Sequence, residues 1–512
     1  MGETDYSEID LESSTHKQMQ PEKKISQYRV IAVVFFMLFI VCLILLMCAV
    51  FFKFGCQAYN DGVKRTVRTS EMKFFHVSDI HLDLNYNQSI SSASYCRSLV
   101  NKTVEKAPFD APYGRVGCDI PYSLLNSSLS FMRTVSARER GNIKFFLLTG
   151  DYVAHDIEKS KGLNGTAEER ILKNIKAVSE ELGKAFPDLP ILPSFGNHDL
   201  PGYYVLPNGS ALYEKVLTMW QPLILCKKCS TKVTTEDELK KTFLMGGYYK
   251  AEIKSAKLTL LQLNSNYWVT SSLSGQPLLV ANAQMKWLAD QLKDAKSGGN
   301  RVVISGHIPI GIFGGVKSDN YWIKKYANTY IELVTKTYKD IVIGQLYGHT
   351  HFDDMRLQLL NDKVDDVMDS ESSFLLTAPG ITPVMFNNPG FRIFSFDTNK
   401  RMLADYHQYY MDLVLTTQTK IPTWLFDYSF SDKYMSHLPE GKSFINGKLI
   451  SDIVESFVNR TNENRHWQNY IQHRQVNYQP DPYSRYVLYC SAKHVTKTVF
   501  DECVKKHPVT GG

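Results

Sequence analysis

The sequence lacks a strong charge of either sign. Its 58 Lys and Arg residues nearly balance 52 Asp and Glu residues, which leaves a net charge of +6 over 512 residues. A nucleic-acid-binding protein usually carries a concentrated basic surface, so the composition gives no nucleic-acid-binding footprint. Internal repeats and low-complexity segments are also missing. Hydrophobic residues make up 44% and charged residues 21%, which is the balance of a globular protein and excludes a disordered chain, a coiled coil and a collagen-like rod.

Long apolar runs are absent with one exception near the N-terminus. Residues 30–52 carry no charge and lie between Arg29 and Lys53. Because a helix needs about 20 apolar residues to cross a bilayer, this segment predicts one transmembrane signal anchor. A cleaved signal peptide, whose apolar core is usually about 7–15 residues, fits less well. We expect a cytosolic disordered tail at 1–29, the anchor at 30–52 and a linker at 53–70, followed by an enzyme-sized body.

Two asymmetries orient this anchor. The positive charges on its two sides balance, but all Asn-x-Ser/Thr sites and all cysteines outside the apolar run follow it. Both features are typical of the secretory lumen or the cell exterior. We therefore predict a single-pass type II membrane protein with a lumenal or extracellular body. The six candidate glycosylation sites are Asn87, Asn101, Asn126, Asn164, Asn208 and Asn459.

Nine cysteines are few for this length, and two of them lie inside the apolar run. Six cysteines allow 15 connectivities. Proximity in the sequence favours three pairs: Cys96 with Cys118, Cys226 with Cys229, and Cys490 with Cys503. A redox or zinc role for the Cys226-Lys-Lys-Cys229 pair is disfavoured, because no second such pair or histidine is nearby. The remaining Cys56 could link a disulfide-bonded dimer, could be acylated if the topology is reversed, or could be free.

Five short apolar runs each end abruptly in residues that bind metals. Apolar runs of this length predict buried strands, and ligands gather in the loops beyond strand carboxyl ends. Side by side, these ends would bring Asp, Asn and His side chains to one rim. Carboxylate and amide oxygens with imidazoles, and without thiolates, suit zinc, manganese or iron. The five ends are Asp79-x-His81, Gly150-Asp151, Gly196-Asn197-His198-Asp199, Gly306-His307 and Gly348-His349-x-His351.

This order of motifs resembles the calcineurin-like metallophosphoesterase superfamily. The additional His155, with the segments 378–392 and 404–410, is similar to the branch of acid sphingomyelinase-like phosphodiesterases and vacuolar endopolyphosphatases. The resemblance implies an α/β fold, a four-layer α/β/β/α sandwich of two mixed sheets, with the catalytic domain over 71–419. Over 420–512 we expect a C-terminal helical subdomain with a disulfide.

The resemblance also implies the roles of the site residues. It implies two divalent metal ions, with zinc as first choice and manganese or iron as alternatives. His198 would contact phosphate and donate a proton to the leaving oxygen, a role that suits an imidazole with its reference pKa of about 6.5. Asp199 could orient His198, and His155 would be a second phosphate contact. The ligands of one ion would be Asp79, His81 and His351, those of the other Asn197, His307 and His349, with Asp151 bridging both.

We therefore predict a dinuclear metal-dependent hydrolase of phosphodiester or phosphoanhydride bonds, of the acid sphingomyelinase-like phosphodiesterase type. Its substrate would be a phosphate ester or polyphosphate, and its compartment a lysosome, a vacuole or the cell exterior. A vacuolar endopolyphosphatase is the alternative. Sphingomyelin is less favoured, because acid sphingomyelinases carry a saposin-like domain ahead of the catalytic part. A non-catalytic receptor on the same fold is disfavoured, because every matched position is filled.

The remaining pattern gives secondary structure. Residues 168–186 show the spacing of an amphipathic helix between the second and third predicted strands, and residues 283–295 a similar helix before the fourth. The polar segment 85–126 predicts a loop insertion near the cleft. His76, inside the first predicted strand, is interpreted as a strand histidine whose hydrogen-bonding groups are satisfied, without a role in the site.

Overall fold

The computed structural model describes residues 36–37, 39–40 and 70–507, with gaps at 99–102, 140, 158–162, 203, 270–272, 313–319, 361, 364–371, 437, 439–442, 460–464 and 480–482. Residues 1–69 and 70–512 form two compact units. In the first unit, the four described residues are helical and exposed. Most of the predicted anchor, the tail, nearly all of the linker and Cys56 lie outside the described residues. Within the part of the chain that is described, no helix is long and apolar enough to cross a membrane.

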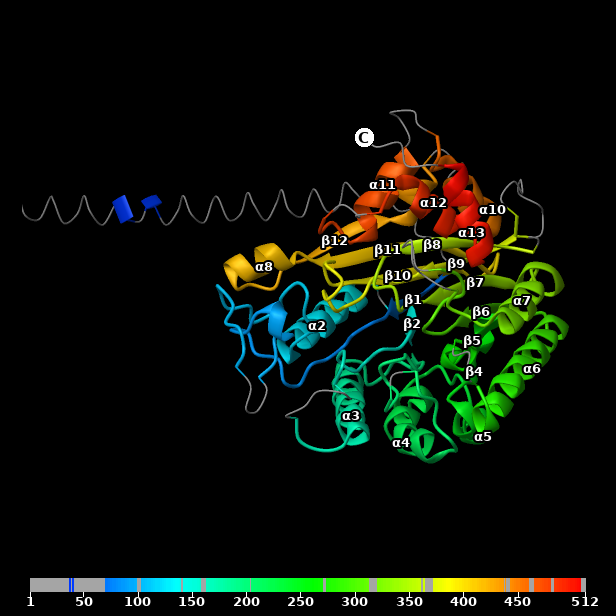
Figure 1. Ribbon diagram of the computed structural model, residues 1–512, viewed down its shortest axis with the longest axis horizontal. Coiled ribbons are helices and arrows are strands. Elements are labelled where there is room, and N and C mark those ends of the chain that lie inside the picture. Colours follow the sequence, from blue (N-terminus) through cyan, green and yellow to red (C-terminus); the bar gives the residue numbers. More distant parts are fainter. Residues whose placement is uncertain are drawn as a thin grey trace, which may run out of the picture. The chain divides into compact units, whose positions relative to one another are not determined.

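Two six-stranded sheets form the centre of the second unit (Figure 1). The first sheet has the order β12-β11-β10-β1-β2-β3. Its three site strands β1, β2 and β3 run parallel, whereas β10, β11 and β12 continue the sheet from β1 by antiparallel pairing. The strands are β1 (Glu71–Val77), β2 (Ile143–Leu148), β3 (Ile191–Pro193), β10 (Gly390–Asp397), β11 (Met402–Met411) and β12 (Trp424–Ser429).

The second sheet has the order β4-β5-β6-β7-β9-β8. Strands β5, β6, β7 and β9 are parallel neighbours, and β4 and β8 pair antiparallel at the two edges. The sheets approach each other through β7 and β11. Both sheets are mixed, as predicted. The strands are β4 (Tyr249–Ile253), β5 (Leu258–Gln262), β6 (Arg301–Ser305), β7 (Val342–Tyr347), β8 (Asp354–Leu359) and β9 (Ser372–Thr377).

Helices complete the α/β arrangement. Helices α10 and α12 pack against β8, and Figure 1 shows α10–α13 gathered beside β8 and β9. The longer helices earlier in the chain are α2 (Tyr122–Arg138), α3 (Ala167–Ala185), α4 (Ala211–Leu225), α5 (Glu236–Gly246) and α6 (Gly275–Ser297). The others are α7 (Lys324–Glu332), α8 (Leu413–Thr419), α9 (Phe430–Tyr434), α10 (Gly447–Ser456), α11 (Arg465–Arg474), α12 (Arg485–Lys493) and α13 (Lys497–Lys506).

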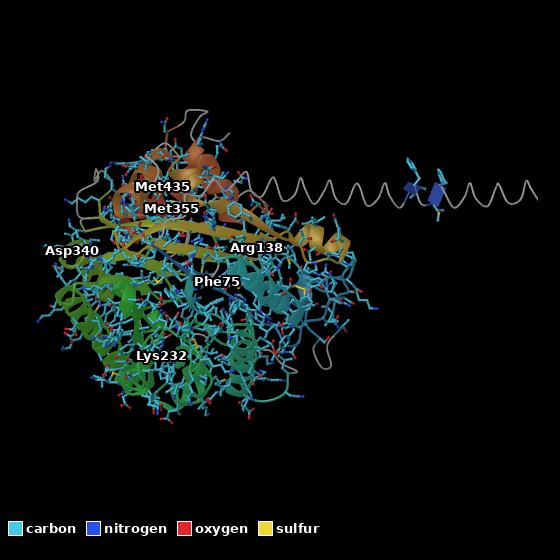
Figure 2. All side chains as sticks on the ribbon, turned by 180° about the vertical axis from the view of Figure 1, so that it is seen from behind. Phe75, Arg138, Lys232, Asp340, Met355 and Met435 are labelled. Atoms are coloured by element: carbon cyan, nitrogen blue, oxygen red, sulfur yellow. A yellow bond between two sulfur atoms is a disulfide. The ribbon has the colours of Figure 1, made fainter. Side chains whose placement is uncertain are left out.

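The core between these layers is aromatic and aliphatic. The ring of Phe74 on β1 stacks on Phe145 of β2 at 4.6 Å and on Phe394 of β10 at 5.2 Å. Figure 2 shows the buried Phe75 inside the body, whereas the exposed Asp340 lies at its edge. Burial of these large side chains fixes the strand order, and with it the positions of the strand ends.

Most of the predicted elements are confirmed, and three differ. Helix α3 matches the predicted 168–186 segment and begins at a capping box formed by Thr166 and Glu169. Helix α6 is longer than the predicted 283–295. The segment 85–126 was expected to be an insertion loop, but its last residues form the first turn of α2. The region from residue 420 onward was expected to be helical, but it first contributes strand β12 to the first sheet. The division of the body at residue 420 stays a prediction.

Disulfides and candidate glycosylation sites lie on this body. The structure contains the disulfides Cys96–Cys118, Cys226–Cys229 and Cys490–Cys503. Asn126, Asn164, Asn208 and Asn459 are exposed and Asn87 is half-buried, while Asn101 lies outside the described residues.

Candidate metal centre

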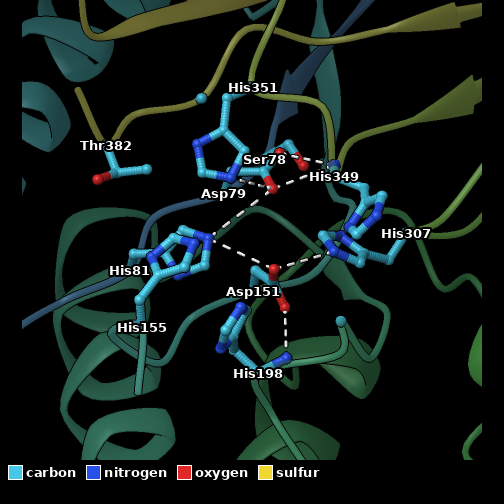
Figure 3. Close-up of polar contacts among 12 residues, drawn as sticks. Ser78, Asp79, His81, Asp151, His155, His198, His307, His349, His351 and Thr382 are labelled. Carbon is cyan, nitrogen blue, oxygen red and sulfur yellow. Dashed lines mark hydrogen bonds and ion pairs between the residues drawn. The ribbon is translucent and has the colours of Figure 1, made fainter. Parts of the chain in front are cut away.

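The ends of five strands from both sheets meet at one place (Figure 3). Strands β1, β2 and β3 come from the first sheet, and β6 and β7 from the second. The structure thereby brings together residues that are up to 272 positions apart in the sequence. These are Asp79 and His81 after β1, Asp151 after β2, Asn197 and His198 after β3, His307 after β6, and His349 and His351 after β7.

The side chains of this cluster approach one another closely. Asp151 Oδ2 lies 3.0 Å from His307 Nε2 and 3.4 Å from His81 Nε2. His307 Nε2 is also 3.0 Å from Asn197 Oδ1. Asp79 Oδ1 lies 3.4 Å from His351 Nε2. Figure 3 draws the contacts of both carboxylates. The carboxylates of Asp79 and Asp151 are therefore the two centres around which the imidazoles are arranged.

Three groups of these residues could each hold a metal ion, since their ligand atoms lie within 4.8 Å of one another. The groups overlap, and Asp151 belongs to two of them. They are Asp79 with His81 and Asp151, Asp151 with His307 and His349, and His81 with His155 and His351.

The backbone at these residues is unusual. Five of the seven predicted ligands have a positive φ, a region that side chains other than glycine rarely enter. Such conformations cost about 1–3 kcal/mol each and concentrate at functional sites. The residues and their φ angles are Asp79 (51°), His81 (47°), Asp151 (57°), His349 (72°) and His351 (63°).

Two imidazoles are oriented by backbone carbonyl groups. His81 Nδ1 lies 2.8 Å from the carbonyl oxygen of Val153, and His307 Nδ1 lies 2.6 Å from that of Thr149. A carbonyl oxygen only accepts, so the proton of each neutral ring is on Nδ1. The lone pair of Nε2 then faces the cluster, which is how metal-binding histidines are held in proteins.

The Asp199 carboxylate accepts hydrogen bonds from the backbone of the turn that carries Asp151. Its Oδ2 accepts the backbone N–H groups of Gly196 at 2.8 Å and Asp151 at 3.0 Å, and its Oδ1 accepts that of Tyr152 at 2.9 Å. We expected Asp199 to orient His198, and the structure assigns its carboxylate to the backbone of this turn. His198 itself donates its backbone N–H to Asp151 Oδ1 at 2.9 Å.

Glycine is required where two of these turns touch. A Cβ atom built on Gly196 would lie 2.6 Å from Asp151 Cγ, with the backbone N and Oδ1 of Asp151 closer still. A Cβ on Gly348 would lie 2.6 Å from Asp79 Oδ2. Real Cβ atoms essentially never come within 3.0 Å of another heavy atom. The glycines of both motifs therefore allow the close approach that brings the carboxylates into the cluster.

Burial and neighbouring charges shift the pKa values of the carboxylates and imidazoles in the cluster. Burial lowers the pKa of His307, but the adjacent Asp151 carboxylate outweighs burial and raises the pKa to about 9. Burial raises the pKa of Asp151, yet His307 and His198 hold it well below its usual range. Burial and the neighbouring His307 lower the pKa of His349 to about 3. The Asp151 carboxylate is therefore ionised and the His349 imidazole is neutral, whereas Asp151 favours the protonated form of His307.

Comparison with known proteins identifies the family to which the chain belongs. A model of the calcineurin-like phosphoesterase family matches residues 72–353, which is more than half of the chain. The chain belongs to this family. The match runs from β1 to the residue before β8 and therefore contains all seven predicted metal ligands.

Curated relatives support the same assignment for this metallophosphoesterase. The chain is 30% identical over 375 residues to the cyclic GMP-AMP phosphodiesterase SMPDL3A of Bos taurus, which covers 71% of the chain and 76% of the relative. It is 27% identical over 379 residues to the acid sphingomyelinase-like phosphodiesterase 3b of Homo sapiens (72% and 77%). It is 27% identical over 441 residues to the sphingomyelinase phosphodiesterase C of Dictyostelium discoideum (84% and 92%). The chain is a metallophosphoesterase of the phosphodiesterase type.

The metallophosphoesterase fold implies divalent metal ions, and the residues of the cluster fit them. Oxygen donors from Asp and Asn and nitrogen donors from His are the ligands of zinc, manganese and iron. Among the residues that the structure describes, the buried Nε2 of His81 and the buried Nδ1 of His351 have no hydrogen-bond partner. Buried polar atoms almost always have a partner, so the orphaned Nε2, 3.4 Å from Asp151 Oδ2, is a position that a cation would satisfy.

Two further histidines border this metallophosphoesterase site. The ring of His155 stacks on that of His81 at 3.9 Å and lies 4.3 Å from that of His198 (Figure 3). The side chain of His155 is 19% exposed, whereas the ligand histidines His81 and His307 are fully buried. His155 is therefore less buried than His81 and His307 and lies at the border of the cluster.

Sequence reasoning missed the residues that support His155. Its Nδ1 lies 2.8 Å from Asp119 Oδ1, and its backbone N–H donates to Asp119 Oδ2 at 2.6 Å. Burial lowers the pKa of His155, but the Asp119 carboxylate outweighs burial and raises it. Asp119 is separated from His155 by 36 positions and belongs to none of the strand-end motifs. Its one local signal is its place directly after Cys118.

Proposed function

We propose that this metallophosphoesterase hydrolyses phosphodiester bonds with two divalent metal ions bound by the cluster at the strand ends. The observation that carries the proposal is the shared position of Asp151, which belongs to two of the three potential ligand groups. A carboxylate is the natural ligand between two cations, because each of its oxygens can face one of them. One ion would be held by Asp79, His81 and His351, and the other by Asn197, His307 and His349.

The metal ions supply, when bound, Lewis-acid stabilisation of charge on the phosphoryl group and a lowered pKa for water. Zinc is our first choice, with manganese and iron as alternatives. The protein's own contribution is the fixed geometry of the ligands. The carbonyl groups of Val153 and Thr149 hold the rings of His81 and His307, so these two rings are already oriented for metal binding.

The two bordering histidines would handle the substrate. His155 would contact a phosphate oxygen, and His198 would contact phosphate and donate a proton to the leaving oxygen. Their rings lie 4.3 Å apart, which is close enough for both to reach one phosphoryl group. Both histidines would thus bind the phosphoryl group, and His198 would also assist the departure of the leaving group.

The relatives guide the choice of substrate. One relative is named for cyclic GMP-AMP, a cyclic dinucleotide, and another is named a sphingomyelinase phosphodiesterase. Both compounds contain a phosphodiester bond, although one is soluble and the other is a lipid. We propose a soluble phosphodiester such as a cyclic dinucleotide as the first substrate class, and sphingomyelin as the second candidate.

The body of the chain would work in a lumenal or extracellular compartment. Disulfides persist in oxidising compartments, and three are present in the described residues. Four asparagines of Asn-x-Ser/Thr sites are exposed and available to a glycosyltransferase. These observations support the proposed type II topology, with residues 1–29 in the cytosol, 30–52 as the anchor, 53–70 as a linker, a catalytic domain at 71–419 and a C-terminal subdomain at 420–512.

A substrate panel tests the proposed function. The full chain, purified in detergent, is stripped of metal with EDTA and reloaded separately with zinc, manganese or iron. Each form is assayed with bis(p-nitrophenyl) phosphate, a cyclic dinucleotide, sphingomyelin and polyphosphate between pH 4.5 and 7.5, with the Asp151→Asn variant as matched control. We expect hydrolysis of at least one diester that EDTA abolishes and metal restores. Hydrolysis of polyphosphate without any diester, or diester hydrolysis that survives EDTA, would contradict the proposal.

A further inference from the structure

Asp119 is a buried carboxylate with four hydrogen-bond contacts, two of them to His155. The residue is 4% exposed. Oδ1 accepts from His155 Nδ1 at 2.8 Å and from Thr382 Oγ1 at 3.2 Å. Oδ2 accepts from the backbone N–H of His155 at 2.6 Å and from Arg97 Nη2 at 3.2 Å. Because a carboxylate offers about four acceptor positions, every one of them is used, and two of them serve His155.

A disulfide fixes both charged residues of this arrangement. Cys96 directly precedes Arg97, and Cys118 directly precedes Asp119, so the Cys96–Cys118 bond joins the backbone at both. Arg97 is 2% exposed and also forms an ion pair with the buried Asp83. Cys96 and the preceding Tyr95 both have positive φ, at 54° and 55°. Two consecutive residues in this region are unfavourable, so the covalent bond and the ion pairs hold a chain path that would otherwise relax.

We propose that Asp119 is a positioning residue for His155 and that Arg97 and the Cys96–Cys118 disulfide fix Asp119 in place. The inference rests on the proposed function, in which His155 contacts the phosphate. An imidazole on the border of a site can rotate about its side-chain torsions. The contact between Nδ1 and Asp119 Oδ1 removes that freedom and holds the ring stacked on that of His81, where His155 forms a potential ligand group with His81 and His351.

A double-mutant cycle separates positioning from general stability. The four proteins are the wild type, Asp119→Ala, His155→Ala and the double variant, assayed as full chains with bis(p-nitrophenyl) phosphate. Each loss should be about 10²-fold in kcat/KM, the lower end of what one positioned catalytic side chain contributes. If Asp119 acts through His155, the double variant should be no slower than His155→Ala alone. Bound metal per chain should be unchanged.

Two matched controls come from the same chain. Asp362 Oδ1 accepts from His494 Nδ1 at 2.7 Å, and its Oδ2 accepts two backbone N–H groups, so it copies the contacts of Asp119 outside the metal cluster. Asp362→Ala should lose thermal stability but keep kcat/KM within about threefold of the wild type. The double substitution Cys96→Ala/Cys118→Ala should lower kcat/KM about tenfold. The same change at Cys226 and Cys229 should not.

The outcomes separate this inference from the proposed function. If the wild type hydrolyses no diester, the proposed function fails and the inference falls with it. If the wild type is active and His155→Ala is impaired, wild-type activity of Asp119→Ala overturns the inference alone. Fully additive losses in the double variant overturn it as well. Should Asp119→Ala not fold, Asp119→Asn replaces it in the cycle, because the amide keeps the side-chain volume but loses the negative charge that faces His155 Nδ1 and Arg97 Nη2. That variant should lose part of the wild-type kcat/KM, and the loss should be absent when His155→Ala is combined with it.

Discussion

Replacing Gly196 by alanine is the sharpest steric test of the site. The new Cβ would lie 2.6 Å from Asp151 Cγ, against a minimum of 3.0 Å for real contacts, so Asp151 or its neighbouring turn must move by at least 0.4 Å. The backbone N and Oδ1 of Asp151 are closer still, so the shift at the carboxylate oxygens must be larger. Gly196 has no positive φ, and the effect is therefore steric rather than conformational.

Two magnitudes follow from this displacement. Overpacking of a buried position costs about 1–3 kcal/mol of folding stability. A misplacement of about 1 Å in a catalytic group costs about 10²-fold in rate. We therefore expect Gly196→Ala to fold with a lowered melting temperature, to bind less metal and to lose about 10²-fold in kcat/KM.

The assay compares hydrolysis of bis(p-nitrophenyl) phosphate, metal content by mass spectrometry and thermal unfolding. Gly298→Ala is the matched control, because a Cβ there would lie 3.4 Å from its nearest neighbour, an ordinary contact. That variant should behave like the wild type. Wild-type metal content and kcat/KM in Gly196→Ala would refute the role of this close approach.

The other predictions concern the cluster, the core and the surface. Asp151→Asn should abolish turnover and lower metal content, because an amide cannot supply two anionic oxygens; full activity at normal metal occupancy would refute the bridging role. His198→Ala should slow turnover by about 10²-fold while the metals stay bound, and unchanged kinetics would remove its proposed role. Burial and the neighbouring Arg392 hold the pKa of His76 well below 6.5, so at falling pH the unfolded chain binds a proton at this residue that the folded chain does not. Stability is therefore lost as the pH falls below about 6.5, and His76→Gln should show a smaller decrease in melting temperature between pH 7 and pH 5 than the wild type; an equal decrease would contradict this. Endoglycosidase treatment of the protein from a eukaryotic host should increase its gel mobility, and an unchanged band would count against a lumenal body.

The sequence predicted the strands of the site because their signal is local. Each of the five apolar runs is a strand in the structure, and each ends at the predicted motif. Glycine directly before Asp151, Asn197, His307 and His349 marked the points at which turns come close together. Burial of the runs and the chemistry of the residues after them were sufficient to expect a metal site. His76 lies fully buried in β1 with Nε2 3.2 Å from Thr149 Oγ1, whereas its Nδ1 has no hydrogen-bond partner among the described residues, so the expectation of a satisfied strand histidine is met for one ring nitrogen.

Other features could not be predicted because they depend on long-range contacts. Asp119 contacts His155 only in the folded protein, where the disulfide-bonded loop packs against the turn that follows β2. No local sequence pattern predicts this contact. Helix α2 was missed because its serine-rich sequence directly continues a polar segment. Strand β12 was missed because Trp424–Ser429 lies in a region rich in Tyr and His that favoured helices, and its strand conformation depends on long-range pairing with β11.

The left-handed backbone of the ligand residues was also beyond sequence reasoning. Aspartate and histidine enter the region of positive φ more often than most residues, but still only in a small fraction of cases, so the residue types of Asp79 and His351 do not predict it. Hydrogen bonds between distant turns impose it, as when the backbone N–H of His349 donates to Asp79 Oδ2 at 3.0 Å. The tertiary structure therefore stores strain in the ligand turns that their local sequence does not reveal.

Anomalous diffraction from crystals of the metal-loaded protein tests the central claim most directly. Data collected on both sides of the absorption edges of zinc, manganese and iron would locate each ion and identify it. We predict two peaks, both at coordination distance from Asp151, one of them also beside Asp79, His81 and His351 and the other beside Asn197, His307 and His349. A single peak, or peaks that do not share Asp151, would contradict the two-metal site on which the proposed hydrolysis depends.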